Sequence, residues 1–340
     1  MKKRNTAPTL LDVARMAGVS TATVSRCFNS PDRVVETTRD KVQLIVEELG
    51  YTPHFGGRAL ASNRSNTVGA IIPTMDNAIF ARGIQAFQET LADNNVTLLI
   101  ASSGYDPERE FQQIQSLISQ GADGLLLIGH ARPENTYNFL QRRQIPYVVT
   151  WNYRPDSSSF NVGFDNRKAA TQIAQQVIKF GHKHIAIITA HTEFNDRALD
   201  RLNGVRDAME SSDIPIDNLV IIPTTYSLKS GGNAFDSFMA RTPRPTVIIC
   251  GNDVLATGAI SRANEMGIKI PDEVSVTGFD DIDLAEVIQP KLTTVHVPHR
   301  RMGESAAGLL LDIIDGKAGC QSVELETKIV IRESLGPASL

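Results

Sequence analysis

The stretch TLLDVARMAGVSTATVSR, residues 9–26, decides how the first part of the chain folds. Its apolar residues recur at helical spacing, and one face of the expected helix comprises Leu10, Val13 and Ala14. Thr9 opens the segment and Asp12 follows three residues later, which is a variant of the capping-box spacing. A short helix is therefore predicted to begin directly after Thr9.

A second helix is predicted from Ser20 to about Phe28. Gly18 breaks the first periodic pattern where a turn requires a positive φ, and Ser20 is a favoured N-cap residue. Val24 would fill the space between the two helices, and the outward positions would be Thr21, Ala22, Ser25 and Arg26. Hydroxyl and N–H groups at such a helix start can bind phosphate, and Arg26 can reach a base edge. The spacing is that of a helix-turn-helix, although a helical hairpin without DNA affinity has a similar pattern.

A third helix is predicted at about 37–49, ending at Gly50, because apolar residues again share one face. Residues 52–66 are rich in small and polar residues and are the best candidate for a linker. Residues 1–66 hold ten Lys and Arg against six Asp and Glu, a net charge of +4, whereas the remainder carries −8. A basic head on an acidic body indicates that the head meets a polyanion.

The chain has 340 residues, of which 41% are hydrophobic and 21% charged. At roughly 100–200 residues per domain, two to three domains are expected. The three cysteines, Cys27, Cys250 and Cys320, lie in no Cys-x-x-Cys spacing, which disfavours a disulfide framework or a zinc site. No apolar run approaches the roughly 20 residues of a membrane helix, and the basic start lacks the apolar stretch of a secretory signal. We therefore expect a cytoplasmic protein with no membrane partner.

From residue 68 onward, short β-rich runs alternate with longer amphipathic stretches. Eight such runs lie between Val68 and Gly278, with helical patterns between them. This alternation predicts parallel sheets with crossover helices. The polar stretch 152–160 interrupts the pattern and predicts two α/β halves of similar size. Ligands of such sheets bind at the carboxyl ends of the strands, so the polar residues that follow each strand are the candidates for a site.

Three segments of the head, residues 9–26, Thr38–Val42 and Leu49–Pro53, resemble the DNA-binding head of the lactose-repressor (LacI) family. The resemblance covers almost the whole chain. The motifs that carry it through the body are Val68–Pro73, Asp165–Asn166, Gly181–His182, Arg201–Gly204, Asn252–Asp253, Gly278–Asp280 and Leu292–Val295.

The resemblance implies an all-α helix-turn-helix head at 1–52, a hinge helix or linker at 53–66, and a two-lobed body at 67–334 similar to periplasmic binding proteins. The first lobe would comprise about 67–164 and 294–324, and the second about 165–293 and 325–334. It also implies a sequence-specific transcriptional regulator of the repressor type that acts as a homodimer on pseudo-palindromic double-stranded operator DNA. No enzyme activity and no cofactor are implied.

Carried over residue by residue, the family's base contacts fall on Thr21, Ala22 and Arg26. Leu60 would wedge into the minor groove at the centre of the operator. The contacts to phosphate and their neighbours fall on Thr9, Ser20, Thr23, Ser25, Asn29, Arg33, Tyr51 and His54.

Two positions depart from the family pattern, and a pair of glycines weakens the expected hinge helix. Val35 stands where the family usually has a serine that caps the third helix and touches phosphate, so that cap and contact are in doubt. Ala22 offers no hydrogen bond, so specificity there would come from a thymine methyl group or from DNA shape. Gly56 and Gly57 each cost up to about 1 kcal/mol relative to Ala in a helix, and they predict a hinge that is disordered without DNA.

The resemblance also implies a small polar effector bound between the two lobes. The candidate residues are Asn77, Phe80, Trp151, Asn195, Arg197, Arg201, Tyr226, Asn252 and Asp280. Arg donates in a planar fork, Asp accepts bidentately and Asn does both, which suits the vicinal hydroxyls of a sugar. A purely structural role competes for several of them: Trp151 as a core residue, Asn252 and Asp280 as caps, and Arg201 as a surface ion-pair partner.

Arg82, His191 and Arg197 add positive charge near the proposed cleft and suggest a sugar acid or a sugar phosphate. The segment 69–125 resembles the gluconate-repressor branch of the family more than the purine branch. The amino-acid sequence indicates neither the operator sequence nor the direction in which the effector acts. An effector could release the protein from DNA or recruit it.

Two other classes of protein are weighed against a regulator. A solute-binding protein for transport would need an export signal, and the head argues against it. A sugar-metabolising α/β enzyme would need a catalytic pair, and we find no glycine-rich nucleotide motif or nucleophile motif. The pairs His182–His184 and His296–His299 have short spacings, but their turn contexts disfavour metal. Without a terminal leucine heptad, a dimer is favoured over a tetramer.

Overall fold

The computed structural model describes residues 7–52, 64–76 and 78–339 of the chain. Two compact units, Met1–Thr67 and Val68–Leu340, make up the protein. We refer to them as the head and the body and describe each by itself. The predicted hinge disorder falls at 53–63, outside the described residues. None of the described helices is long and apolar enough to cross a membrane.

The head contains three α-helices and one short 3₁₀ turn among its described residues. They are α1 (Leu10–Ala17), α2 (Thr21–Asn29), η1 (Pro31–Arg33) and α3 (Glu36–Leu49). Their apolar faces meet in one small core, and Val24 is fully buried in it as expected. The helix-turn-helix arrangement of α1 and α2 is therefore present.

Local caps fix the turn between α1 and α2. The Thr9 backbone N–H donates to the Asp12 carboxylate at 2.9 Å, and the Asp12 N–H donates to the Thr9 hydroxyl at 3.4 Å, which completes a capping box. Gly18 ends α1 with a φ of 67°, in the left-handed region that glycine adopts without strain. Ser20 caps α2 by accepting from the Thr23 N–H. Val35 precedes α3 without a side-chain cap, as the sequence indicated.

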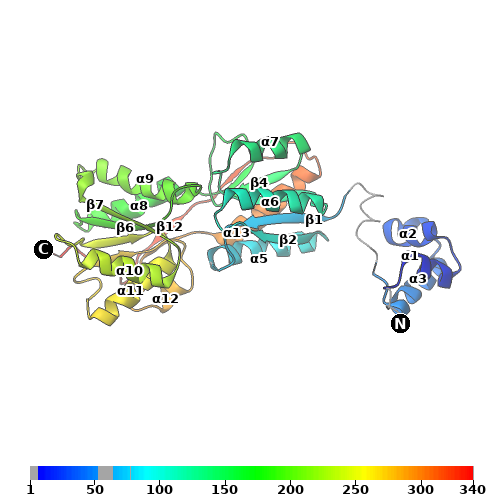
Figure 1. Cartoon of the computed structure of the whole chain (residues 1–340), viewed down its shortest axis with the longest axis horizontal. Helices are drawn as coiled ribbons and strands as arrows, with labels where there is room; N and C mark the ends of the chain where they lie inside the picture. Colours follow the sequence, from blue (N-terminus) through cyan, green and yellow to red (C-terminus); the bar gives the residue numbers. More distant parts are fainter. Residues whose placement is uncertain (1–6, 53–63, 77, 340) are drawn as a thin grey trace. The chain divides into compact units, whose positions relative to one another are not determined.

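The first lobe of the body is a six-stranded parallel sheet in the order β11-β5-β4-β3-β1-β2. The strands are β1 (Thr67–Ile72), β2 (Thr97–Ser102), β3 (Gly124–Ile128), β4 (Tyr147–Thr150), β5 (Asn161–Gly163) and β11 (Val323–Glu324). Successive residues of β1 and β3 enter opposite cores. The helices on the two faces are α5 (Ala78–Asp93) and α13 (His299–Ile314) on one, and α6 (Pro107–Ser119) and α7 (Glu134–Arg143) on the other (Figure 1).

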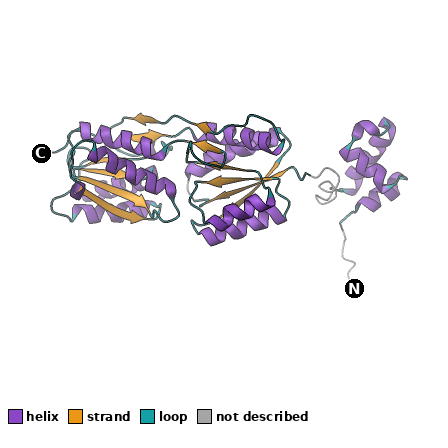
Figure 2. Ribbon diagram, turned by 90° about the horizontal axis from the view of Figure 1, so that it is seen from above, coloured by secondary structure: helices purple, strands orange, loops and turns teal. Residues whose placement is uncertain are grey.

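The second lobe is a four-stranded parallel sheet in the order β7-β6-β8-β9. The strands are β6 (Ile185–Ala190), β7 (Leu219–Thr224), β8 (Val247–Cys250) and β9 (Ser275–Thr277). Helices α8 (Asn166–Lys179) and α9 (Asp196–Glu210) cover one face, and α10 (Leu228–Met239) and α11 (Asp253–Met266) the other. Figure 2 shows helices on both sides of each sheet, the arrangement predicted from the alternating pattern.

Segments that connect the lobes include an antiparallel pair, β10 (Thr294–His296) with β12 (Lys328–Val330). The chain crosses a first time between β5 and α8, a second time through β10 and a third time through β12. The sequence pattern did not predict these short strands, nor β5, β11, the short helix α12 (Leu284–Val287) or the 3₁₀ turn η2 (Ile216–Asn218). Each is too brief to produce a periodic signal.

Candidate effector and DNA-binding sites

The start of α2 displays the residues expected to read DNA. Thr21, Ala22 and Arg26 are exposed, while Val24 between them is buried. The hydroxyls of Ser20 and Thr23 lie 2.9 Å apart at the first turn, beside backbone N–H groups that have no helical partner. The surface therefore offers hydroxyl groups, a helix N-terminus and one guanidinium, which together can hold a phosphate backbone and reach a base.

The other DNA-contact candidates fall into three groups. Thr9, Ser20 and Arg33 are exposed and Ser25 is half-buried. Tyr51 is buried in the head core, where its ring centroid lies 6.4 Å from that of Phe28, so it has a packing role. The side chain of Asn29, and the hinge residues His54 and Leu60, lie outside the described part of the chain.

In the body, the polar candidates follow the carboxyl ends of the strands. Asp280 lies three residues beyond β9 and is fully buried, with a φ of 106°. Its backbone N–H donates to the Val295 carbonyl at 2.9 Å, which ties it to the segment that crosses between lobes. Neither carboxylate oxygen has a hydrogen-bond partner among the described residues. A buried carboxylate in that state is costly unless a ligand satisfies it.

Burial raises the pKa of the Asp280 carboxyl to about 7, and the nearby Arg201 cation opposes that rise. The Arg201 guanidinium stacks on the Phe279 ring, with its central carbon 4.1 Å from the ring centroid. It also donates to the Asn166 side-chain oxygen at 2.9 Å and to the Gly251 carbonyl at 2.5 Å. The Arg201 side chain is thus buried and fixed by these contacts. The alternative prediction, that Arg201 forms an ion pair on the surface, is wrong.

Two more buried polar groups lack partners close to Asp280. Neither ring nitrogen of His299 forms a hydrogen bond with a described residue, and its Nε2 lies 3.9 Å from Asp280 Oδ1. Burial lowers the pKa of His299 to about 3, against a smaller opposing effect of the Asp280 backbone, so the imidazole is uncharged at neutral pH. The Trp151 indole N–H likewise has no partner in the described part of the chain, and the Trp151 and His299 rings have centroids 6.3 Å apart. We call these three side chains, Asp280, His299 and Trp151, the polar floor.

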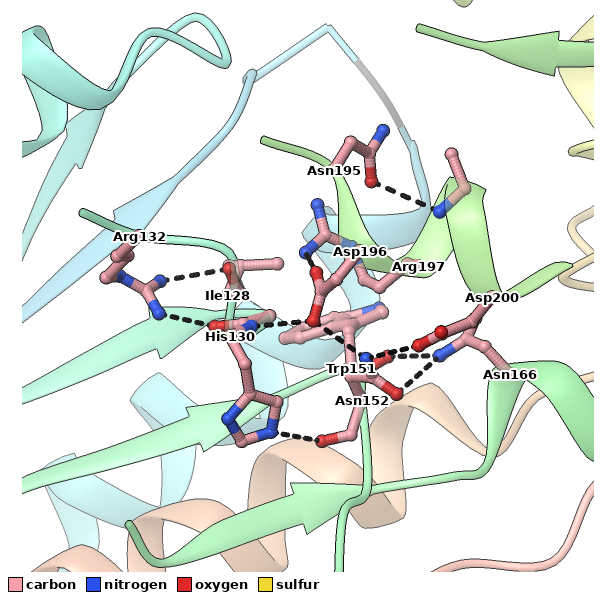
Figure 3. A network of polar contacts seen from close by, with 12 residues as sticks. Ile128, His130, Arg132, Trp151, Asn152, Asn166, Asn195, Asp196, Arg197 and Asp200 are labelled. Carbon is pink, nitrogen blue, oxygen red and sulfur yellow. Dashed lines mark hydrogen bonds and ion pairs between the residues drawn. The ribbon is translucent and has the colours of Figure 1, made fainter. Parts of the chain in front are cut away.

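A polar network joins the two lobes beside the polar floor (Figure 3). Asp196, at the first position of α9, accepts from the His130 backbone N–H and from the Asn152 side-chain amide, both at 2.7 Å. Arg197 pairs with the other oxygen of Asp196 at 3.0 Å, and both side chains are buried. Burial acts to raise the pKa of Asp196, but the Arg197 cation and these donors outweigh it and hold the pKa below its usual range.

The same network reaches Arg201. The Asn166 amide, which accepts from Arg201, donates to the Trp151 carbonyl at 2.8 Å and to the Asn152 side-chain oxygen at 3.3 Å. Asn152 also donates to Asp200, at 2.9 Å. A continuous chain of hydrogen bonds therefore runs from Arg201 to the contact between lobes, as the dashed lines of Figure 3 show in part.

The remaining effector candidates have mainly structural contacts. Phe80 is buried in the core of the first lobe, edge-on to Trp151 with ring centroids 5.3 Å apart. Asn195 caps α9 and Asn252 caps α11. The side-chain nitrogen of Asn252 is nevertheless buried, and no described residue accepts a hydrogen bond from it. Tyr226 is half-buried, 6.3 Å from the Tyr105 ring; Asn77 lies outside the described residues.

The extra positive charges proposed near the cleft are mostly neutralised. Arg82 forms an ion pair with Asp283, and Arg197 is paired with Asp196. His191 is exposed. These three residues therefore do not indicate an anionic effector.

Comparisons with known proteins assign the chain to a family. Residues 9–54 match the model of bacterial regulatory proteins of the lacI family, and residues 174–335 match that of the periplasmic binding protein-like domain. The chain is 34% identical to the HTH-type transcriptional repressor PurR of Vibrio campbellii, over 96% of this chain and 98% of the relative. It is 33% identical to the HTH-type transcriptional repressor CytR of Escherichia coli K12, over 98% of each.

The chain belongs to the LacI family. It is a transcriptional regulator with a helix-turn-helix head and a periplasmic-binding-protein-like body, and its relatives are repressors, not enzymes. The two identities are nearly equal and do not decide a branch, so the likeness to the gluconate-repressor branch stays a prediction.

Solved structures of the LacI family share the fold. A LacI-family transcriptional regulator from Silicibacter pomeroyi is 27% identical, with a TM-score of 0.89 over 97% of this chain and 99% of that one. A complex of the transcriptional regulator CelR with cellobiose is 28% identical, with a TM-score of 0.69 over 96% and 99%. A regulator from Enterococcus faecium with bound ribose is 25% identical, with a TM-score of 0.71 over 80% and 99%.

Sequence reasoning missed several residues of this LacI-family site. His299 was considered only as a metal ligand and Asn166 only as part of a family motif, and Asn152 and Asp196 were not considered as site residues. Asn166 and Asp196 begin the helices that follow β5 and β6, and this position beyond a strand end is the signal that could have found them. His299 lies at the start of α13, behind the short strand β10 that the sequence pattern did not predict.

Proposed function

We propose that this chain is a repressor that binds operator DNA as a homodimer and whose affinity for that operator is set by a small polar effector held between the two lobes. The polar floor is the observation that supports control by an effector. Its side chains are at most 3% exposed, and their polar atoms have no hydrogen-bond partner among the described residues. Hydroxyl groups of a ligand would satisfy them.

The head supports the DNA half. Thr21, Ala22 and Arg26 face outward from a helix whose N-terminal turn carries two hydroxyls, and the basic charge of the head favours a polyanion. Arg26 would contact a base edge and provide specificity. The region of Ser20 and Thr23 would contact phosphate and position the head on the duplex. Two heads of a homodimer would read two half-sites of a pseudo-palindromic operator.

The hydrogen-bond chain from Arg201 to Asp196 offers a route by which the effector acts. A ligand on the polar floor would touch Trp151, whose carbonyl accepts from Asn166, and would lie near Arg201. Shifts of Asn166 or Asn152 would change the contacts of Asp196 with the first lobe. A difference of 1–3 kcal/mol between lobe arrangements would change operator affinity roughly 5–150-fold.

The test is binding of the full chain to DNA selected by that chain from a random duplex pool. Fluorescence anisotropy would be measured with and without ribose and cellobiose, the sugars seen with the two structural relatives. We expect selection of a two-fold symmetric site and a change of at least about fivefold in affinity with one of the ligands. Selection of no common sequence would contradict the DNA half of the proposal.

A further inference from the structure

A groove of about 980 Å³ lies on the first lobe, between α7 and the segment 154–159. We call it the α7 groove. None of the three side chains of the polar floor lines it. Its volume falls within the range of small-molecule sites, roughly 300–1,000 Å³. The groove is therefore a candidate for a ligand site separate from the proposed effector site.

The wall of the α7 groove is aromatic and apolar. The rings of Tyr137 and Tyr147 have centroids 6.3 Å apart, and Leu140 in the same wall is fully buried. Both tyrosine hydroxyls are engaged within the lobe. Tyr137 donates to the His130 carbonyl at 2.8 Å, and the Tyr147 hydroxyl lies 2.6 Å from that of Ser159. The two tyrosines are thus held in place and offer ring surface to a ligand, which favours a planar aromatic molecule.

The His130 ring adds a hydrogen-bond acceptor to this wall. Its Nε2 lies 3.2 Å from the Asn152 carbonyl, which can only accept, so Nε2 carries the proton (Figure 3). Burial lowers the pKa of His130, against the opposing effect of the Asp196 carboxylate, so the imidazole is uncharged at neutral pH. Nδ1 is then a bare nitrogen that can accept from an N–H group of a ligand.

The charges along the α7 groove favour an uncharged ligand. Among the described residues that line it, the charged ones are Arg154 and Asp156, which have opposite signs. The Arg154 guanidinium already faces two carboxylates of α9, at 3.4 and 3.7 Å. The exposed polar side chains of the rim, which are Gln141, Gln144 and Ser158, carry no charge. An ionic ligand would therefore find no free countercharge along this wall.

Two residues that line the groove also hold the contact between the lobes. The backbone N–H of His130 donates to Asp196 at 2.7 Å, and Arg154 pairs with Asp200 and, at a longer distance, with Asp196. Asp196 and Asp200 both belong to α9 of the second lobe. A ligand that moves or fixes His130 or Arg154 would therefore change how α9 is held.

We propose that the α7 groove is a second ligand site, which takes an uncharged planar aromatic molecule carrying an N–H donor, and that its occupant changes operator affinity through His130 and Arg154. The ring of the ligand stacks on Tyr137 and Tyr147, and its donor meets His130 Nδ1. Binding at the groove is independent of the polar floor. The effect on operator affinity rests on the proposed function.

Indole and 1-methylindole are the matched probes, because one methyl group removes the N–H donor. Titration calorimetry of the full chain measures both, with cyclohexanol as a saturated ring that cannot stack. We expect indole to bind with a Kd of about 1 mM or below, 1-methylindole about threefold or more weakly, and cyclohexanol about tenfold or more weakly. Absence of indole binding, or equal binding of indole and cyclohexanol, would overturn the proposal.

Two tryptophan variants of α7 locate the site. Gln141 lines the groove, Asn138 does not, and both are exposed. Gln141→Trp should fill the groove and weaken indole binding about tenfold or more. Asn138→Trp is the matched control and should leave indole binding within about twofold. Thermal unfolding without probe checks that both variants fold. Equal indole affinities of the two variants would place indole elsewhere and overturn the site.

His130→Leu tests the acceptor. The variant keeps the backbone N–H that Asp196 accepts and loses the ring nitrogen. Indole and 1-methylindole should then bind with affinities within about twofold of each other. A preference for indole as large as that of the unchanged protein would overturn the role of His130.

The anisotropy of operator DNA selected by the full chain tests the effect on DNA binding. With saturating indole we expect operator affinity to change about fivefold or more, and Gln141→Trp to abolish the change. Unchanged operator affinity with indole bound would overturn the action on α9. The proposed function would then still stand, because ribose and cellobiose test it separately.

Discussion

Asp196 accepts a hydrogen bond from the backbone N–H of His130 at 2.7 Å, although the two residues follow strands of different sheets. Asp196 begins α9 of the second lobe, and His130 lies two residues beyond β3 of the first. The contact is buried on the Asp196 side and is reinforced by Asn152 and Arg197. Together with the Asn152–Asp200 contact one turn further along, it attaches the start of α9 to the opposite lobe.

Asp196→Ala should therefore destabilise the body strongly. Removing one partner of a buried ion pair leaves Arg197 without its carboxylate, and the cost is about 3–5 kcal/mol. Urea unfolding of the full chain measures this cost. Asp207→Ala, on the same helix, is the control, because the Asp207–Arg167 pair is largely exposed and should be worth no more than about 1 kcal/mol. Equal losses for the two variants would contradict the attachment role.

Asp280→Asn should stabilise the protein above neutral pH. The folded pKa of Asp280, about 7, is above its usual value of 3.8. Between these values the folded carboxyl keeps a proton that the unfolded one has lost, so the free energy of unfolding falls as pH rises from about 4 through 7. The amide does not titrate and avoids that loss.

The measurement for Asp280→Asn is thermal unfolding across pH 5 to 9 beside the unchanged protein. The titratable neighbours on the packed elements, Arg201, Asp253 and His299, are present in both proteins. We expect the Tm difference between the variant and the unchanged protein to grow with pH. It should grow by about 2–4 °C for each kcal/mol of difference in their free energies of unfolding. A Tm difference that is constant with pH would show that the carboxyl is ionised throughout.

Val35→Ser should stabilise the head. Val35 precedes α3 without a side-chain cap and is 72% exposed, so its replacement removes little packing. A serine there can accept from an N–H of the first turn and should add about 1 kcal/mol. Thermal unfolding followed through the head's helical signal measures it, with Val35→Ala as the control. Equal stability of the Ser and Ala variants would refute the cap.

Arg26→Lys should lose base discrimination more than overall affinity. A lysine keeps the charge that attracts phosphate but cannot make the bidentate contact to a guanine edge. Against the selected operator we expect a loss of about 1–3 kcal/mol, and against unrelated duplex DNA a much smaller one. Anisotropy titrations with both duplexes at one salt concentration measure the two losses. Parallel losses on both would assign Arg26 to the phosphate backbone.

Local sequence patterns predicted most of the fold. The capping residues Thr9 and Ser20, the turn glycine Gly18 and the alternation of strands and helices predicted the elements that the structure contains. Elements of two to four residues, such as β10, β11 and α12, were not predicted, because their formation depends on distant segments and not on local periodicity.

The candidate site was predicted less completely. Arg201, Asp280 and Trp151 were named from resemblance, and the structure brings them into one buried region. Their partners Asn166 and His299 were not assigned to the site, because the side chains approach only when α8 and α13 pack against the strand ends. The pairing of Arg82 and Arg197 with carboxylates was equally invisible in sequence, and it changes the expected charge of the effector.

The most direct test of the account is the anisotropy of selected operator DNA titrated with the full chain, in the presence and absence of one small-molecule probe, which is ribose or cellobiose, whichever binds more tightly by calorimetry. The account predicts that this probe changes operator affinity at least about fivefold and that Asp280→Asn abolishes the change while DNA binding without probe persists. An unchanged operator affinity, with the probe bound as shown by calorimetry, would contradict it.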